Sequence, residues 1–344
     1  MEKNHSEQTY PSDLVTRCLN LQRQLRDHVL ATIRQSSLEE LSGVASETEG
    51  DTIFRLDRLS EPLLISLLKE HFGGKYSFVL ICEGLTDKAE RVFPETQNPT
   101  AAQLRIIIDP IDGTRGLMYD KRSAWILMGV APNLGEHTTL QDVEIAVQTE
   151  IPTSKGLYSD SLWAIKGQST MGERQNLLTG ECHQLCPRPS KATSLRYGFA
   201  TIAKFFPGGT DLLARISEEL VAELLGPLEQ HKAHVFEDQY ISTGGQFYEL
   251  IMGHDRLIAD LRSCLDSWLI AHGRPLPLCC HPYDLCTMLI AKQAGVIVTD
   301  ATGNPLNAPL NTTENLSWIA YANDKLREVV EPVLLRLLRK HKLI

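Results

Sequence analysis

The residues with the clearest capacity for chemistry lie in one short segment, Asp109-Pro-Ile-Asp-Gly-Thr114. The segment follows an apolar, β-branched run, Leu104–Ile108, which is typical of a buried strand. Pro110 and Gly113 restrict the chain to a tight turn, so the two carboxylates can face one point. Carboxylate oxygens are the ligands that a hard cation such as Mg²⁺ prefers.

Backbone groups of the same turn can add to this chemistry. The carbonyl of Ile111 can serve as a further oxygen ligand, and the N–H groups of Gly113 and Thr114 can bind a phosphate. A turn that carries two solvated aspartates is the alternative explanation.

Three more acidic residues stand where the chain enters or leaves a predicted element. Glu83 follows an apolar run, as Asp109 does, so both project from the same kind of sheet edge. Asp57 precedes a predicted helix, and Asp284 lies at the start of another. Because a helix dipole stabilises an acid at the N-terminus, a structural role accounts for Asp57 and Asp284 as well as a catalytic one.

The elements that must position these residues follow from the hydrophobic periods. Helices are predicted over 14–34, 60–68, 211–225, 244–252, 283–294 and 324–340, and strands over 76–81, 104–108, 125–130, 143–149, 162–165, 255–261, 296–299 and 317–321. Segment 36–56 shows no clear period, and the polar, turn-rich segment 167–192 is predicted to connect two halves. The pattern indicates a layered α/β protein.

We expect one catalytic unit over residues 14–344, with halves of about 14–170 and 190–344, behind a flexible N-terminus over 1–13. Of the 344 residues, 42% are hydrophobic and 22% charged, which excludes disorder as the main state. No run approaches the roughly 20 apolar residues of a membrane span. The net charge of −9 makes nucleic acid a poor partner. The polar N-terminus lacks the apolar core of a signal peptide, so we expect a cytoplasmic protein.

Eight cysteines are scattered along the chain, which is typical of reduced thiols. Two clusters, Cys182-His-x-x-Cys186 and Cys279-Cys280-His281, raise the question of zinc. Neither has the paired spacing of a zinc site, so buried or loop thiols are the favoured interpretation.

The turn Asp109-Pro-Ile-Asp-Gly-Thr114 resembles the signature of the inositol monophosphatase family, within the lithium-sensitive, Mg²⁺-dependent phosphatase superfamily. The segment Tyr283-Asp284 to Ala294-Gly295 resembles the second signature, an aromatic residue and Asp that open a helix ending in Ala-Gly. Further matching positions, in the same order over roughly residues 14–310, are Asp57, Glu61, Glu83 and Ser242-Thr243-Gly244-Gly245. The resemblance implies the layered inositol-monophosphatase-like fold, an alternating α-β-α-β-α sandwich.

The resemblance also implies two or three Mg²⁺ ions in the active site. Glu83, Asp109 and the Ile111 carbonyl resemble the ligands of the first ion, and Asp109, Asp112 and Asp284 those of the second.

The resemblance also implies the catalytic and substrate-binding positions. Thr114 and Asp57 resemble the pair that orients and activates the attacking water, and the Gly113 and Thr114 amides resemble the phosphate-binding groups. The other implied phosphate or substrate positions are Arg115, Gly244, Gly245 and Asp260.

The sequence departs from the family pattern in four places. Gly84 replaces a second Glu, which implies weaker affinity for an additional metal, and Gly245 replaces a serine of many members. Tyr283 stands where the family has Trp. Arg115-Gly-Leu117 is closer to the Lys-Gly-Phe of 3′(2′),5′-bisphosphate nucleotidases than to the Thr-Asn-Phe of inositol monophosphatases.

The function implied by the resemblance is Mg²⁺-dependent hydrolysis of a small phosphorylated polyol or sugar. Arg115 keeps open a 3′(2′),5′-bisphosphate nucleotidase, because it can contact a second phosphate. Gly84 keeps open a metal-binding regulatory homologue with little turnover. Family members are often homodimers, which makes a homodimer the oligomeric state to test.

Overall fold

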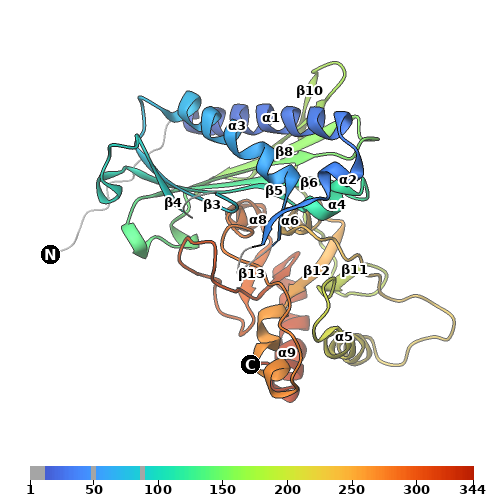
Figure 1. The fold of residues 1–344 in the computed structure, drawn as a ribbon. Helices are drawn as coiled ribbons and strands as arrows, with labels where there is room; N and C mark the ends of the chain where they lie inside the picture. The colour runs from blue at the N-terminus through green and yellow to red at the C-terminus, as the bar shows by residue number, and fades with distance from the viewer. Residues whose placement is uncertain (1–11, 48–51, 86–89) are drawn as a thin grey trace.

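The computed structural model describes residues 12–47, 52–85 and 90–344, which form stacked layers of helix and sheet (Figure 1). Helices α1 (Ser12–Gln35) and α3 (Arg55–Phe72) cover one face of a large sheet. Helices α6 (Thr243–Ile251) and α8 (Met288–Ala294) lie between that sheet and a smaller one, which α5 (Thr210–Leu225) and α9 (Asp324–Lys340) cover. The predicted α-β-α-β-α order of layers is thus confirmed.

The large sheet has eight strands in the order β10-β9-β8-β7-β6-β5-β3-β4. Their bounds are β3 Phe78–Cys82, β4 Glu90–Phe93, β5 Leu104–Asp112, β6 Ala124–Pro132, β7 Ile145–Ile151, β8 Tyr158–Ile165, β9 Met171–Asn176 and β10 Cys182–Leu185. Strands β3 and β5 run parallel and the other neighbours antiparallel. The ends of β3 and β5 therefore meet at one edge, as the sequence predicts for Glu83 and Asp109.

The smaller sheet has the order β11-β12-β14-β13. Its strands are β11 Phe199–Ile202, β12 Asp255–Asp260, β13 Ile297–Asp300 and β14 Trp318–Tyr321. Short elements complete the described chain: α2 Leu38–Leu41, β1 Val44–Glu47, β2 Thr52–Phe54, α4 Thr114–Met118 and α7 Asp266–Ala271.

Two apolar cores hold these layers together. The first joins α1 and α3 to the large sheet. The α1 residues at the predicted period are Leu14, Cys18, Leu21, Leu25, Val29 and Ile33, of which Ile33 is partly buried and the others are fully buried. The second core lies between the sheets and around α5 and α9. Among the described residues, no helix is both long enough and apolar enough to cross a membrane.

Several predicted boundaries are wrong. Helix α3 begins at Arg55, not Ser60, because the Asp57 carboxylate accepts the Phe54 N–H and stabilises an earlier first turn. Segment 36–56 contains α2, β1 and β2 in its described part. Helix α5 begins at Thr210, one residue before the predicted range of 211–225, because Gly209 rather than Thr210 is its N-cap.

Other predictions fail at the sheet edges and before α8. Segment 167–192 contains β9 and β10, whose polar sequences show no strand period because β10 is largely exposed and β9 is mostly half-buried. Strands β4 and β11 were not predicted. Residues 282–287 form turns, and α8 begins only at Met288. Residues 1–11 of the predicted flexible N-terminus lie outside the described residues, and α1 begins at Ser12.

Candidate active site

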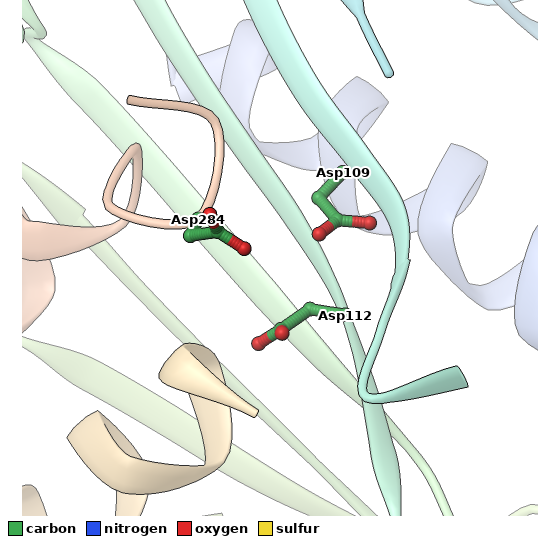
Figure 2. Close-up of side chains that lie close together, drawn as sticks. All are labelled: Asp109, Asp112 and Asp284. Atoms are coloured by element: carbon green, nitrogen blue, oxygen red, sulfur yellow. The ribbon is translucent and has the colours of Figure 1, made fainter. Parts of the chain in front are cut away.

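Three carboxylates from distant parts of the chain converge at the edge of the large sheet (Figure 2). Asp109 and Asp112 lie at the end of β5, where the pairing with β6 shifts register between them. Asp284 comes from the turn that precedes α8. One oxygen of each residue lies within 4.8 Å of the others, and Asp109 and Asp112 are only 3% and 6% exposed.

Burial and mutual repulsion raise the free energy of these carboxylates in their ionised form. The pKa of Asp109 is raised well above its ordinary value by burial first, and then by the charges of Glu83, Asp112 and Asp284. Burial raises the pKa of Asp112 to about 6, against the lowering effect of hydrogen bonds from Gly244, Ser242 and Thr243. A cation among these oxygens would offset the repulsion. Since every atom that could ligate a metal in this group is an oxygen, the group fits Mg²⁺ better than a thiophilic metal.

Helix α6 directs its first turn at Asp112. The Ser242 hydroxyl donates to Asp112 Oδ2 at 2.8 Å, and the Gly244 N–H donates to the same oxygen at 2.6 Å. The Thr243 N–H reaches Asp112 Oδ1 at 3.3 Å. Ser242 also accepts the Gly245 N–H at 2.9 Å, so it caps the helix and positions the carboxylate at once.

The structure gives Gly244 and Gly245 a different role from the substrate contact expected of them. Both are buried, and their N–H groups donate to Asp112 and to Ser242. A Cβ on Gly244 would lie 2.4 Å from a Leu127 methyl carbon, and one on Gly245 would lie 2.3 Å from the Tyr240 ring. These glycines therefore permit the close approach of α6 to β6 and to Tyr240.

The turn before α8 orients Asp284 and one further acid, Glu83. The His281 N–H donates to Asp284 Oδ2 at 2.6 Å, and the Tyr283 hydroxyl donates to Glu83 Oε1 at 3.1 Å. The His281 and Tyr283 rings stack, with centroids 5.3 Å apart and planes 8° apart. Glu83 lines the same cleft as the three aspartates, at the end of β3. The turn thus holds Asp284 and Glu83 toward a common space.

Thr114 and Asp57, predicted as a pair, are in contact. Thr114 Oγ1 lies 2.9 Å from Asp57 Oδ1 and 2.7 Å from the Ile111 carbonyl oxygen. Asp57 Oδ2 accepts the Phe54 N–H at 2.8 Å, so Asp57 stabilises the start of α3 and contacts Thr114 together. One hydroxyl proton serves one acceptor at a time. When it is donated to Asp57, a lone pair of Thr114 Oγ1 can accept a hydrogen bond from water.

Gly113 allows the turn that places Thr114. Its φ of 95° lies in the left-handed region, and a Cβ there would be 3.0 Å from the Ser242 Cβ. The Ile111 N–H donates to Asp109 Oδ1 at 3.0 Å, which fixes that carboxylate against its own turn. Ile111, Gly113 and Thr114 all line the cleft.

The cleft encloses about 530 Å³ of space open to solvent, and its wall includes residues that the sequence analysis missed. Arg115 lines the cleft as expected, together with Phe205, Phe206 and Arg262. Asp260, expected to hold a substrate hydroxyl, is instead fully buried, and both its oxygens accept from Arg262. Arg262 begins a loop, residues 262–282, that falls outside the family resemblance, but its place two residues after Asp260 at a strand end was a usable signal.

The cysteines give no sign of nucleophilic chemistry. All eight thiols are free, with Cys182 and Cys186 exposed and Cys279 and Cys280 buried. Cys279 lines the cleft, but burial raises the pKa of its thiol to about 12, so the reactive thiolate is disfavoured.

Comparison with solved structures identifies the fold. An IMPase of Thermotoga maritima superposes with a TM-score of 0.59 at 17% identity, covering 95% of this chain and 99% of that one. The extragenic suppressor protein SuhB of Bartonella henselae gives 0.62 at 15% identity, covering 94% and 98%. Fructose-1,6-bisphosphatase of Leishmania major gives 0.67 at 12% identity, covering 94% and 95%. No family model and no curated protein matches the sequence.

Proposed function

We propose that this chain, which has the fold of the inositol monophosphatase superfamily, is a Mg²⁺-dependent phosphate monoester hydrolase acting on a small phosphorylated polyol or sugar. The observation that carries the proposal is the Thr114–Asp57 hydrogen bond beside an all-oxygen carboxylate cluster in one cleft. A solvated turn does not account for it, because Asp109 and Asp112 are buried, and burial with the neighbouring carboxylates raises the Asp109 pKa despite the hydrogen bond from Ile111.

Asp109, Asp112 and Asp284 would hold one cation, and Glu83 with the Ile111 carbonyl would join Asp109 around a second. Bound Mg²⁺ lowers the pKa of a neighbouring water and stabilises charge on the phosphate and on the leaving oxygen. These roles for Glu83 and for a second ion rest on the family resemblance and on the shared cleft.

The residues of the chain supply proton transfer and orientation. Thr114 Oγ1 accepts a hydrogen bond from the attacking water and donates to Asp57, which orients the water lone pair toward phosphorus. The proton of the water passes through Thr114 to Asp57 as the P–O bond forms. The Gly113 and Thr114 N–H groups bind the phosphate oxygens. The P–O bond to the alcohol oxygen breaks, the released alkoxide takes up a proton from solvent, and Asp57 returns its proton to solvent, so no covalent phosphoenzyme forms.

Phosphate release from a panel of monoesters tests the proposal. The panel is inositol 1-phosphate, fructose 1,6-bisphosphate, histidinol phosphate and adenosine 3′,5′-bisphosphate, each with Mg²⁺ and with excess EDTA. We expect release with Mg²⁺ alone, and a large loss in Thr114→Ala but not in Thr313→Ala, which removes an exposed hydroxyl outside the cleft. Full release in EDTA would refute the metal requirement.

One alternative within the same reaction class has a specific observation behind it. Arg115 lines the cleft, as a 3′(2′),5′-bisphosphate nucleotidase would need for a second phosphate. A regulatory homologue would bind Mg²⁺ or phosphate but release phosphate from no member of the panel. We further propose a small-molecule substrate, no nucleic-acid partner, a cytoplasmic location and a homodimer, the last to be tested by sedimentation.

A further inference from the structure

Part of the cleft is lined by positive and aromatic groups in place of carboxylates. The centroid of the Phe206 ring lies 5.2 Å from Arg115 Cζ and 5.3 Å from Arg262 Cζ, so one ring contacts both guanidinium groups. The ring centroid of Phe205 lies 4.6 Å from Arg262 Cζ, and that of Phe54 lies 5.3 Å from Arg115 Cζ. Such cation–π contacts hold the two guanidinium groups beside the same ring.

Arg262 is built rigidly into this wall. It is 5% exposed, its Nε and Nη2 donate to Asp260, and its Nη1 donates to the Leu278 carbonyl. A guanidinium has five N–H groups. Within the described chain these contacts use three of them, which leaves one N–H on each terminal nitrogen for an oxygen in the cleft. Both oxygens of Asp260 are occupied by Arg262, so Asp260 is not open to accept a substrate hydroxyl.

Arg262 thereby reverses the chemistry of this wall. Asp260 by itself would present hydrogen-bond acceptors and a negative charge, which suit the hydroxyls of a polyol. The Arg262–Asp260 pair presents donors without net charge, and Arg115 lies against the same Phe206 ring as Arg262. Donors of a buried, fixed guanidinium bind an anionic oxygen more strongly than a neutral one.

We propose that the alcohol part of the substrate carries a second acidic group, a phosphate or a carboxylate, and that Arg262 is the specificity-determining residue that binds it together with Arg115. This inference rests on the proposed function, because it concerns the leaving group of the same hydrolysis.

Matched substrate pairs test the inference. Fructose 1,6-bisphosphate is compared with fructose 1-phosphate, and 3-phosphoglycerate with glycerol 1-phosphate, so that the two pairs separate phosphate from carboxylate. The wild-type protein should prefer the second-acid member of at least one pair. The double variant Arg262→Gln/Asp260→Asn leaves no buried charge unpaired, and it should lower kcat/KM for that member by about ten- to a hundredfold, mainly through KM. The partner substrate should change little.

Two further variants separate specificity from structure. Arg262→Lys keeps the charge but loses the planar fork, so it should retain part of the preference. Arg256→Gln removes an arginine of β12, the strand that ends at Asp260, and its guanidinium donates to backbone carbonyls outside the cleft, so it should leave the preference intact. Equal losses on both members of a pair, or no preference in the wild-type protein, would overturn the inference.

Failure of the proposed function gives a different result. If no ester of the earlier panel and no member of the two matched pairs releases phosphate with Mg²⁺, the phosphatase proposal fails. The inference is then decided by binding alone. Calorimetric titration should then show tighter binding of fructose 1,6-bisphosphate than of fructose 1-phosphate, with the difference lost in the double variant. Equal binding of the two would contradict it.

Discussion

Ser242→Ala should weaken both the fold and the metal site, because one hydroxyl serves both. The substitution removes the N-cap of α6, worth about 1 kcal/mol, and a hydrogen bond to the Asp112 carboxylate, worth about 1.5–3 kcal/mol. With a melting entropy near 0.7 kcal/mol/K for a chain of this length, Tm should fall by about 3–6 °C.

The effect on the metal site follows from the pKa of Asp112. Burial raises that pKa to about 6 while Ser242 lowers it, so removing Ser242 should raise it further. Protons then compete better with Mg²⁺ at pH 7, and the half-saturating Mg²⁺ concentration should rise. The difference from wild type should shrink at pH 8, where Asp112 is ionised in both proteins.

Phosphate release against Mg²⁺ concentration, at pH 7 and pH 8, with thermal melts alongside, measures both effects. Asn323→Ala is the matched control, because Asn323 caps α9 by accepting the Leu326 N–H at 3.0 Å, away from the cleft. It should lower Tm without changing the Mg²⁺ requirement. If Ser242→Ala behaves in the same way, the positioning of Asp112 by Ser242 is refuted.

Four other predictions concern the site and the buried charges. Asp112→Asn and Asp284→Asn should lower Mg²⁺ affinity, measured by calorimetry, and added Mg²⁺ should restore part of the activity; a well-folded Asp284→Asn with normal kcat would contradict the cluster. Asp57→Asn should lower kcat by about a hundred- to ten-thousandfold without rescue by Mg²⁺. Gly244→Ala should abolish activity or folding, seen by circular dichroism, because its Cβ would lie 2.4 Å from Leu127. Glu150→Gln should raise Tm at pH 8 much more than at pH 5: burial raises the Glu150 pKa from 4.5 to about 7, so the destabilisation by its charge grows as pH rises between these values and is complete above them.

Local sequence patterns were sufficient for much of the fold. The period of α1 and the apolar runs of β5 and β6 are properties of contiguous residues, so they could be recognised without tertiary information. Strands β9 and β10 could not, because outer strands need no apolar face and their pairing supplies the structure. The early start of α3 depends on Asp57, whose carboxylate was considered only for chemistry.

In the site, too, local sequence patterns account for only part of the arrangement. Asp109, Asp112 and Thr114 are close in sequence, so one turn brings them together. The roles of Gly244 and Asp260 depend on partners elsewhere in the fold. The role of Gly244 depends on its packing against Leu127 of β6. The role of Asp260 depends on Arg262, whose side chain contacts Asp260 only in the folded protein. Position in a motif therefore predicted where these residues lie but not what they contact.

The carboxylate cluster has a consequence for how the protein reaches its native state. Asp109 and Asp112 belong to the large sheet, whereas Asp284 precedes a helix packed between the two sheets. Residues so far apart in the chain come together only when the intervening segment is ordered, so the complete cluster exists only in the folded protein. High-affinity cation binding should accordingly appear together with native structure during refolding. A cation that binds the native state but not the unfolded chain raises the apparent stability of the protein.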